Sequence, residues 1–221
     1  MSEDAQSAVL IVGASPDMVV LARILGVRGY RIGLMSRTEA KLRESQKALI
    51  SEGISCEVFP CDVTDSTAIT SAMTDFACWS PRLDCMVYNV GIESSVAAVE
   101  TTQTEFERVM ETNFFGFVNC FQFALHMFKR FSGGSVVILS SSRALSLAEQ
   151  PVAYAASKSA LQIYVSALRN ETEKYKVSFS EVFLGRKRDG ELMRWLTDDE
   201  IASGVLEAIE RHPKRLVIGE P

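Results

Sequence analysis

The sequence predicts an α/β protein built on a doubly wound parallel sheet of about seven strands, with helices on both faces. Short apolar runs of strand length alternate with longer segments of helical periodicity along almost the whole chain. Several of these runs have apolar residues at consecutive positions, which is typical of strands covered on both faces. Such an alternation favours parallel strands joined by right-handed helical crossovers.

The elements can be placed in chain order from these two patterns. The predicted strands are AVLIV (8–12), RIGLM (31–35), CEVF (56–59), DCMVY (84–88), SVVILS (135–140), VSFSEVF (177–183) and RLVI (215–218). The predicted helices span 17–28, 38–51, 65–77, 104–131, 152–174 and 198–211. Capping residues precede three of these helices, namely Asp65 with Ser66, Thr102 and Thr104 with Glu105, and Thr197 with Glu200.

One predicted helical segment, 113–131, is apolar around most of its circumference. A helix of this kind has to be covered on more than one side. The helix that follows Pro151 is rich in small residues and could pack closely beside it. The two helices then form either a buried pair within one subunit or the interface of a homodimer or homotetramer, and the sequence leaves both interpretations open.

Length and composition indicate one soluble domain over 1–221, with 1–7 as a flexible tail. Hydrophobic residues make up 47% of the 221 residues and charged residues 23%, which excludes a disordered chain. The net charge of −5 argues against nucleic-acid or anionic-membrane partners, and no apolar run approaches the roughly 20 residues of a membrane span. Five scattered cysteines and two histidines predict reduced thiols in the cytoplasm and no metal site.

The most informative pattern for chemistry is Tyr154 followed four residues later by Lys158 at the start of a predicted helix, with Ser141 at the end of the preceding strand. Residues four apart share one helix face, so the ammonium can lie beside the phenol. A nearby cation favours the phenolate and lowers the pKa of a tyrosine, which makes it a usable acid/base near neutrality. Ser141 could hydrogen-bond a substrate carbonyl and orient it toward the phenol.

The stretch SSSRALSLAEQPVAYAASKSAL resembles the active site of short-chain dehydrogenases/reductases, and the likeness runs from about Val9 to Gly219. The resemblance implies a Rossmann-like fold, and it makes Ser141, Tyr154 and Lys158 the catalytic residues. It also implies that Asn113, in METNFFG, is the fourth catalytic residue and holds a water in a proton relay. The alternative for Asn113 is a buried polar side chain that is hydrogen-bonded within its helix.

Further matches imply a nucleotide site. The turn Cys61-Asp62-Val63-Thr64 resembles the family's adenine-binding turn, although a helix cap would also explain Asp62. Tyr88-Asn89-Val90-Gly91 resembles Asn-Asn-Ala-Gly, with two of the four residues changed. The cofactor residues implied are Gly13, Ser15, Met18, Ser36, Arg37, Asp62, Val63, Asn89, Gly91, Tyr154 and Lys158.

The end of the second strand indicates which nicotinamide cofactor is used. A carboxylate there would bind the ribose 2′-hydroxyl of NAD, whereas a nearby arginine accommodates a 2′-phosphate. Ser36 and Arg37 therefore favour NADP over NAD. A solvated loop charge is the alternative interpretation of Arg37.

The chain departs from the family at the glycine-rich loop, where the family has Gly-x-x-x-Gly-x-Gly. Gly13 is kept, but Asp17 and Val19 occupy the two later glycine positions. A carboxylate there competes with the pyrophosphate for the same backbone N–H groups, and like charges in contact weaken binding by several kcal/mol. An Asp17 that turns outward as a helix cap would weaken it less.

A second departure lies after the sixth strand. The family's Pro-Gly and following Thr are missing from Val182-Phe183-Leu184-Gly185, and only RKRDGELMRW (186–195) precedes the last helix. We therefore expect a substrate lid shortened almost to nothing, with the pocket open or completed by a partner subunit. For Arg186, Lys187 and Arg188, an ordinary solvated loop is a better interpretation than contact with an anionic substrate.

The leading functional hypothesis is an NADP-dependent oxidoreductase that acts on a small-molecule carbonyl/alcohol pair, with Tyr154 as acid/base. Two alternatives remain. One is a non-redox enzyme on the same fold, such as a dehydratase, isomerase or cyclase; the other is a cofactor-free pseudoenzyme subunit. The altered glycine loop and short lid favour the non-redox enzyme, and the intact set of four reactive side chains favours the oxidoreductase.

Overall fold

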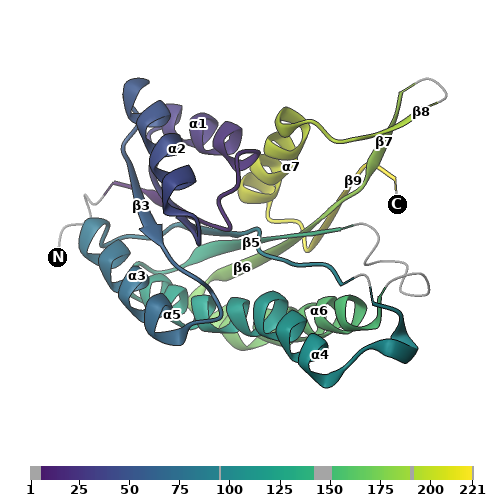
Figure 1. The fold of residues 1–221 in the computed structure, drawn as a ribbon. Helices are drawn as coiled ribbons and strands as arrows, with labels where there is room; N and C mark the ends of the chain where they lie inside the picture. The colour runs from purple at the N-terminus through teal and green to yellow at the C-terminus, as the bar shows by residue number, and fades with distance from the viewer. Residues whose placement is uncertain (1–5, 95, 142–150, 190–191, 221) are drawn as a thin grey trace.

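The protein is described by a computed structural model that covers residues 6–94, 96–141, 151–189 and 192–220. Within these residues the main sheet has seven parallel strands in the order β3-β2-β1-β4-β5-β6-β9 (Figure 1). This confirms the predicted doubly wound sheet. The strands are β1 (Ala8–Val12), β2 (Arg31–Ser36), β3 (Cys56–Pro60), β4 (Cys85–Tyr88), β5 (Gly134–Ser141), β6 (Val177–Leu184) and β9 (Arg215–Ile218).

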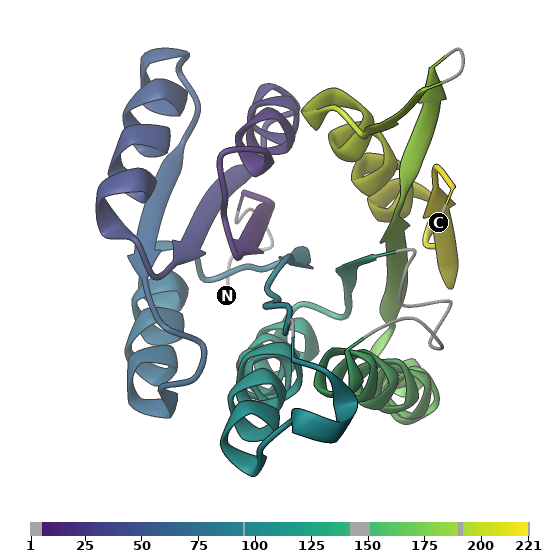
Figure 2. The same cartoon turned by 45° about the vertical axis from the view of Figure 1, so that its right-hand side comes forward.

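Helices cover both faces of the sheet (Figures 1 and 2). One layer contains α1 (Met18–Val27), α2 (Glu39–Ser51) and α7 (Asp198–Arg211), which pack on one apolar cluster of the sheet. The other contains α3 (Ser66–Trp79), α4 (Gln103–Met110), α5 (Gly116–Arg130) and α6 (Val152–Thr172). The short 3-10 turns are η1 (Ala98–Glu100) and η5 (Glu173–Tyr175). The predicted caps are confirmed at Asp65, Thr102 and Thr197, the last as a capping box with Glu200.

The order of the strands reverses between β1 and β4. In a doubly wound sheet, ligands bind beside the carboxyl ends of the strands at such a switch point. Val12, which ends β1, is paired with both Met35 and Tyr88, so three neighbouring strands end there together. The sheet thus defines the edge at which a site should form.

The single helix predicted over 104–131 is interrupted. A π-helical turn, η2 (Glu111–Phe115), separates α4 from α5 and contains Asn113. Single π-turns within α-helices are frequent at functional sites. Gly116 directly follows the turn, where its backbone lies close to two side chains. A Cβ at this position would lie 2.7 Å from Val63 and 2.8 Å from the Tyr88 hydroxyl.

The segment after β6 is exposed, as expected of Arg186–Arg188, but it is not a loop. It forms an antiparallel hairpin of β7 (Arg186–Asp189) and β8 (Leu192–Trp195), which projects beside α7 (Figure 1). Glu200, in the first turn of α7, accepts hydrogen bonds from Lys187 (2.7 Å) and from both terminal nitrogens of Arg194 (2.8 and 3.0 Å). The segment between β6 and α7 is nevertheless short, and the expectation of a reduced substrate lid stays a prediction.

Of the expected tail at 1–7, residues 1–5 lie outside the described part of the chain. Gln6 donates a hydrogen bond to the Gly29 carbonyl (2.7 Å), and the Ser7 carbonyl accepts one from Arg31 N (2.9 Å), so these two residues are tied to the edge of β2. Among the described residues, no helix is both long and apolar enough to cross a membrane.

Candidate active site

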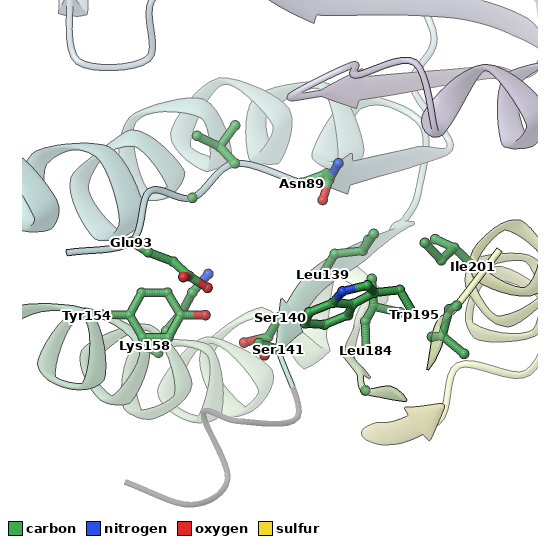
Figure 3. A pocket seen from close by; sticks show the side chains of 14 residues that line it. Asn89, Glu93, Leu139, Ser140, Ser141, Tyr154, Lys158, Leu184, Trp195 and Ile201 are labelled. Carbon is green, nitrogen blue, oxygen red and sulfur yellow. The ribbon is translucent and has the colours of Figure 1, made fainter. Parts of the chain in front are cut away.

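Three of the four predicted catalytic side chains line one cavity of about 340 Å³ at the carboxyl edge of the sheet (Figure 3). Ser141 ends β5, and Tyr154 and Lys158 follow on the first two turns of α6. Tyr154 and Lys158 are both buried, and the Lys158 Nζ lies 5.6 Å from the centroid of the Tyr154 ring. The structure therefore brings together the side chains that the Tyr-x-x-x-Lys spacing placed on one helix face.

Lys158 is held in a dry position. Burial lowers the pKa of its ammonium to about 8, and the negative charge of Glu93, which lines the same cavity, partly opposes that shift. The backbone of Gly91 closes over the amine, since a Cβ at Gly91 would lie 3.2 Å from the Lys158 Nζ. A larger residue at position 91 would have to displace the lysine.

Asn113 lies behind the cavity wall, fully buried in the π-turn. Its Oδ1 accepts a hydrogen bond from Ile92 N (2.7 Å), and its Nδ2 donates to Ile92 O (3.0 Å) and to the Oγ of Ser157 (3.0 Å). Both amide protons are thus used by protein acceptors. Asn113 anchors the loop after β4 to α6, and its part in a water relay stays a prediction.

Sequence reasoning missed Ser157. This side chain is fully buried, and its hydroxyl donates to the carbonyl of Tyr154 (2.8 Å) while it accepts from Asn113. The signal was present, because Ser157 lies three residues after Tyr154, on the same face of the helix. It links the π-turn to the helix turn that carries the acid/base candidate.

Tyr88 was also missed, because it replaces an asparagine of the family pattern. It is fully buried, its hydroxyl donates a 3.3 Å hydrogen bond to the carbonyl of Thr112, and its ring packs edge-on against Phe117. Burial raises the pKa of this phenol well above its ordinary value, so the hydroxyl stays a donor. Tyr88 therefore supports the π-turn from the sheet side.

A second cavity, of about 250 Å³, lies at the switch point between β1 and β4 and shares the wall Asn89–Gly91 with the first. Most of the predicted cofactor residues line it, namely Gly13, Ser15, Ser36, Arg37, Asp62, Val63, Asn89 and Gly91. Met18 does not; it is 1% exposed and packs in the core beneath α1. The two cavities together form an elongated site, with Tyr154 at one end and Arg37 at the other.

The turn after β1 suits a closely approaching ligand. Gly13 has a φ of +81°, and a Cβ there would lie 2.4 Å from the Asn89 carbonyl oxygen, so only glycine fits. Asn89 Nδ2 donates to the Gly13 carbonyl (3.3 Å) and to the Ser15 Oγ (3.2 Å), which braces the turn from β4. A glycine turn beside a helix N-terminus is the usual cradle for a pyrophosphate, so the residues present fit a dinucleotide.

The two substituted glycine positions fall at the start of α1, directly after the turn. Asp17 is the N-cap of α1 but makes no side-chain capping bond, and Val19 packs against the core. Neither is among the described residues that line the two cavities. The predicted weakening of dinucleotide binding by Asp17 therefore stays a prediction.

Arg37 and Asp62 face each other across the outer end of the second cavity, with 3.9 Å between Nη1 and Oδ2. Asp62 Oδ1 accepts hydrogen bonds from the backbone N (2.9 Å) and the hydroxyl (2.8 Å) of Thr64, which fixes the turn. Arg37 is 68% exposed, so this ion pair is weak and its guanidinium is available to an anion.

Comparison with known proteins agrees with this geometry. The family model described as short chain dehydrogenase matches residues 7–194. The chain is 30% identical over 219 residues to a fatty acyl-CoA reductase of Acinetobacter baylyi, covering 94% of this chain and 74% of that protein. It is 28% identical over 240 residues to dehydrogenase/reductase SDR family member 7B of Bos taurus, covering 97% and 74%.

Solved structures share the fold. A short chain dehydrogenase from Mycobacterium smegmatis superposes with a TM-score of 0.85 at 20% identity, covering 98% of this chain and 92% of that one. An actinorhodin polyketide ketoreductase solved with NADPH gives 0.86 at 21% identity, covering 99% and 97%.

Proposed function

The chain belongs to the short chain dehydrogenase family of oxidoreductases, and on that premise we propose that it is an NADP-dependent reductase that interconverts a carbonyl compound and its alcohol. The observation that carries the proposal is the convergence of Ser141, Tyr154 and Lys158 in one cavity that shares a wall with a second, Arg37-lined cavity. An elongated dinucleotide could reach from one cavity into the other along this wall.

When bound, the reduced nicotinamide supplies the hydride that the carbonyl carbon accepts. Ser141 holds the carbonyl oxygen by a hydrogen bond, and the Tyr154 hydroxyl donates a proton to that oxygen, which completes the alcohol. Tyr154 is left as a phenolate, which the ammonium of Lys158 stabilises until a proton from solvent restores the phenol. Because the pKa of Lys158 is about 8, most of the lysine is in the required cationic form near neutrality.

The cationic side chains that line the second cavity favour NADP over NAD. The end of β2 supplies Ser36 and Arg37, and Lys41 adds a second cation to the lining. A 2′-phosphate has a charge-assisted partner in Arg37, whereas the carboxylate expected of an NAD site is missing from the end of β2.

The non-redox alternative rested on Asp17 at the pyrophosphate and on a shortened lid. Asp17 is not among the described residues that line the two cavities, and Trp195 of the hairpin β7–β8 lines the catalytic cavity. These observations support the redox reaction as the proposed function.

We further propose a homodimer or homotetramer in the cytoplasm. The side chains of Phe115 and Ile163 are exposed on the neighbouring elements η2 and α6, which supports burial of this face by a second copy. All five cysteines are free thiols, which supports a reducing compartment.

The proposal is tested by assaying NADPH oxidation by the purified protein with a panel of aldehydes and ketones. It predicts turnover that depends on NADPH and is lost in Tyr154→Phe. Turnover of a substrate that needs Tyr154 but is indifferent to NADPH would instead support a dehydratase, isomerase or cyclase.

A further inference from the structure

The catalytic cavity has an exposed tryptophan on its rim. Trp195, the last residue of β8, lines the same cavity as Ser141 and Tyr154 and is 61% exposed. Figure 3 shows its indole on the opposite side of the cavity from Tyr154 and Lys158. Its large, rigid apolar ring offers a surface that a ligand in the cavity can cover.

The surroundings of Trp195 divide the cavity into two halves (Figure 3). Glu93, the two serines that end β5, Tyr154 and Lys158 form a polar half. The half around Trp195 is lined by the aliphatic side chains Leu139, Leu184, Leu196 and Ile201, and Asn89 lines the wall that the cavity shares with the second cavity. The polar half can bind the reacting carbonyl, and the aliphatic half favours an apolar group.

The indole is held in place by the hairpin. Trp195 is paired with Arg186 in the β7–β8 ladder, and the Arg186 guanidinium lies 4.7 Å from the centroid of its ring. The hairpin is fastened to α7 by the ion pairs of Glu200 with Lys187 and Arg194. These charge-assisted bonds hold the pKa of Glu200 well below its ordinary value. A platform that is ordered before binding loses little entropy when a ligand contacts it.

We propose that Trp195 is the specificity-determining residue of this site, and that the substrate is a carbonyl compound whose reacting carbon carries an aromatic ring or an extended aliphatic chain. The carbonyl binds at Ser141 and Tyr154, and the apolar group lies against Trp195, while the wall Asn89–Gly91 is left to the dinucleotide that enters the same cavity. This inference rests on the proposed carbonyl reduction and adds the substrate class to it.

The test is a homologous series of straight-chain aldehydes from propanal to decanal, with benzaldehyde as the aromatic probe and NADPH as reductant. Each added methylene that becomes buried should raise kcat/KM about fourfold until the apolar half is filled. Trp195→Ala should reduce the preference for decanal over propanal by at least roughly tenfold, and Trp195→Phe, which keeps a ring, by less than about threefold.

The chain offers a matched control in its second tryptophan. Trp79 on α3 has the Arg31 guanidinium 4.0 Å from its ring centroid and packs on Phe76, away from the cavity lining. Trp79→Phe should leave the chain-length preference unchanged. The assignment of Trp195 would be overturned if kcat/KM of the wild type did not depend on chain length. It would also be overturned if Trp79→Phe and Trp195→Ala changed that dependence equally.

A binding measurement separates this inference from the proposed function. Because the chain has two tryptophans, Trp79→Phe leaves Trp195 as the only indole fluorophore. Saturable change of its emission on titration with 1-decanol, but not with 1-propanol, supports the apolar site whether or not any carbonyl is reduced. Reduction of carbonyls without any such change would support the proposed function and overturn the role of Trp195.

Discussion

The side-chain amide of Asn113 donates a 3.0 Å hydrogen bond to the Oγ of Ser157, and both side chains are fully buried. Asn113 is fixed at the same time to both backbone polar groups of Ile92, and Ser157 is fixed to the carbonyl of Tyr154. One buried pair thus sets the π-turn, the loop after β4 and the first turn of α6 relative to one another. Buried networks that are fully satisfied hold a single geometry.

Ser157→Ala should therefore reduce activity through misplacement of Tyr154. The variant removes one buried hydrogen bond and leaves one amide proton of Asn113 unsatisfied. We therefore expect kcat to fall about tenfold and KM for NADPH to change less than about twofold. Steady-state kinetics check this. Thr172→Val is the matched control, because the Thr172 hydroxyl is also buried on α6 and donates to its own helix, to the Leu168 carbonyl (2.7 Å). Equal losses of activity in both variants would reduce Ser157 to a general helix-stabilising residue.

The pH dependence of reduction should follow Lys158. Its pKa of about 8 means that the ammonium is present below that pH and is lost as the pH rises through it. We expect kcat to fall on the alkaline side with an apparent pKa near 8, as measured in a pH–rate profile. In Lys158→Arg, which keeps its charge at all these pH values, any residual activity should lack this alkaline fall. An unchanged alkaline limb in that variant would assign the titration to another group.

Glu93 should tune the same titration. Its negative charge raises the pKa of Lys158, so Glu93→Gln removes that support and should move the alkaline limb to lower pH. The exposed Glu100, which does not line the cavity, supplies the control Glu100→Gln. A shift of the limb to higher pH in Glu93→Gln has the wrong sign and would contradict the electrostatic account.

Arg37 should determine the preference between the two nicotinamide cofactors. Removing the guanidinium in Arg37→Ser should weaken NADPH binding about 10- to 100-fold and leave NADH binding within about threefold. Calorimetric titration with each nucleotide measures both values. Arg43→Ser is the control, since Arg43 is an exposed arginine of α2 that pairs with Glu39 and Glu57 and lies outside the cavity lining. Equal weakening of NADPH and NADH by Arg37→Ser would contradict a 2′-phosphate contact.

Asp17→Gly tests the altered glycine loop. The sequence alone suggested strong repulsion of the pyrophosphate, but Asp17, at the start of α1, is not part of the described cavity lining. We therefore expect NADPH affinity to change by less than about fivefold in this variant. A gain of several orders of magnitude would show that Asp17 blocks the cradle in the wild type.

The predictable part of the fold came from periodicity. The strands and helices were placed to within two residues almost throughout, because apolar positions recur at the spacing of the buried faces. The π-turn at Asn113 was missed, since five residues of altered winding do not disturb an apolar pattern as dense as NFFGF. The hairpin was missed because the charges of β7 hide its alternation, and its stability comes from Glu200 on a later helix.

Only those site residues that belong to a single sequence motif could be predicted. Tyr154 and Lys158 are neighbours by helix geometry alone, so their spacing was sufficient. Ser157 and Tyr88 act through contacts with the π-turn, which no sequence spacing shows. The Met18 side chain does not line the described cofactor cavity, because the loop motif does not specify which side chains of the following helix turn inward to the core. Its contact with the cofactor stays a prediction.

The most direct test is the rate of NADPH oxidation by the wild type and by Tyr154→Phe with one aldehyde substrate, alongside NADPH binding by each protein. We expect the alcohol to appear in step with NADPH loss in the wild type. We expect Tyr154→Phe to bind NADPH within about threefold of the wild type but to react roughly 10²- to 10⁴-fold more slowly. Failure of both proteins to bind NADPH, or an undiminished rate in Tyr154→Phe, would contradict the proposed role of Tyr154 in an NADPH-dependent reduction.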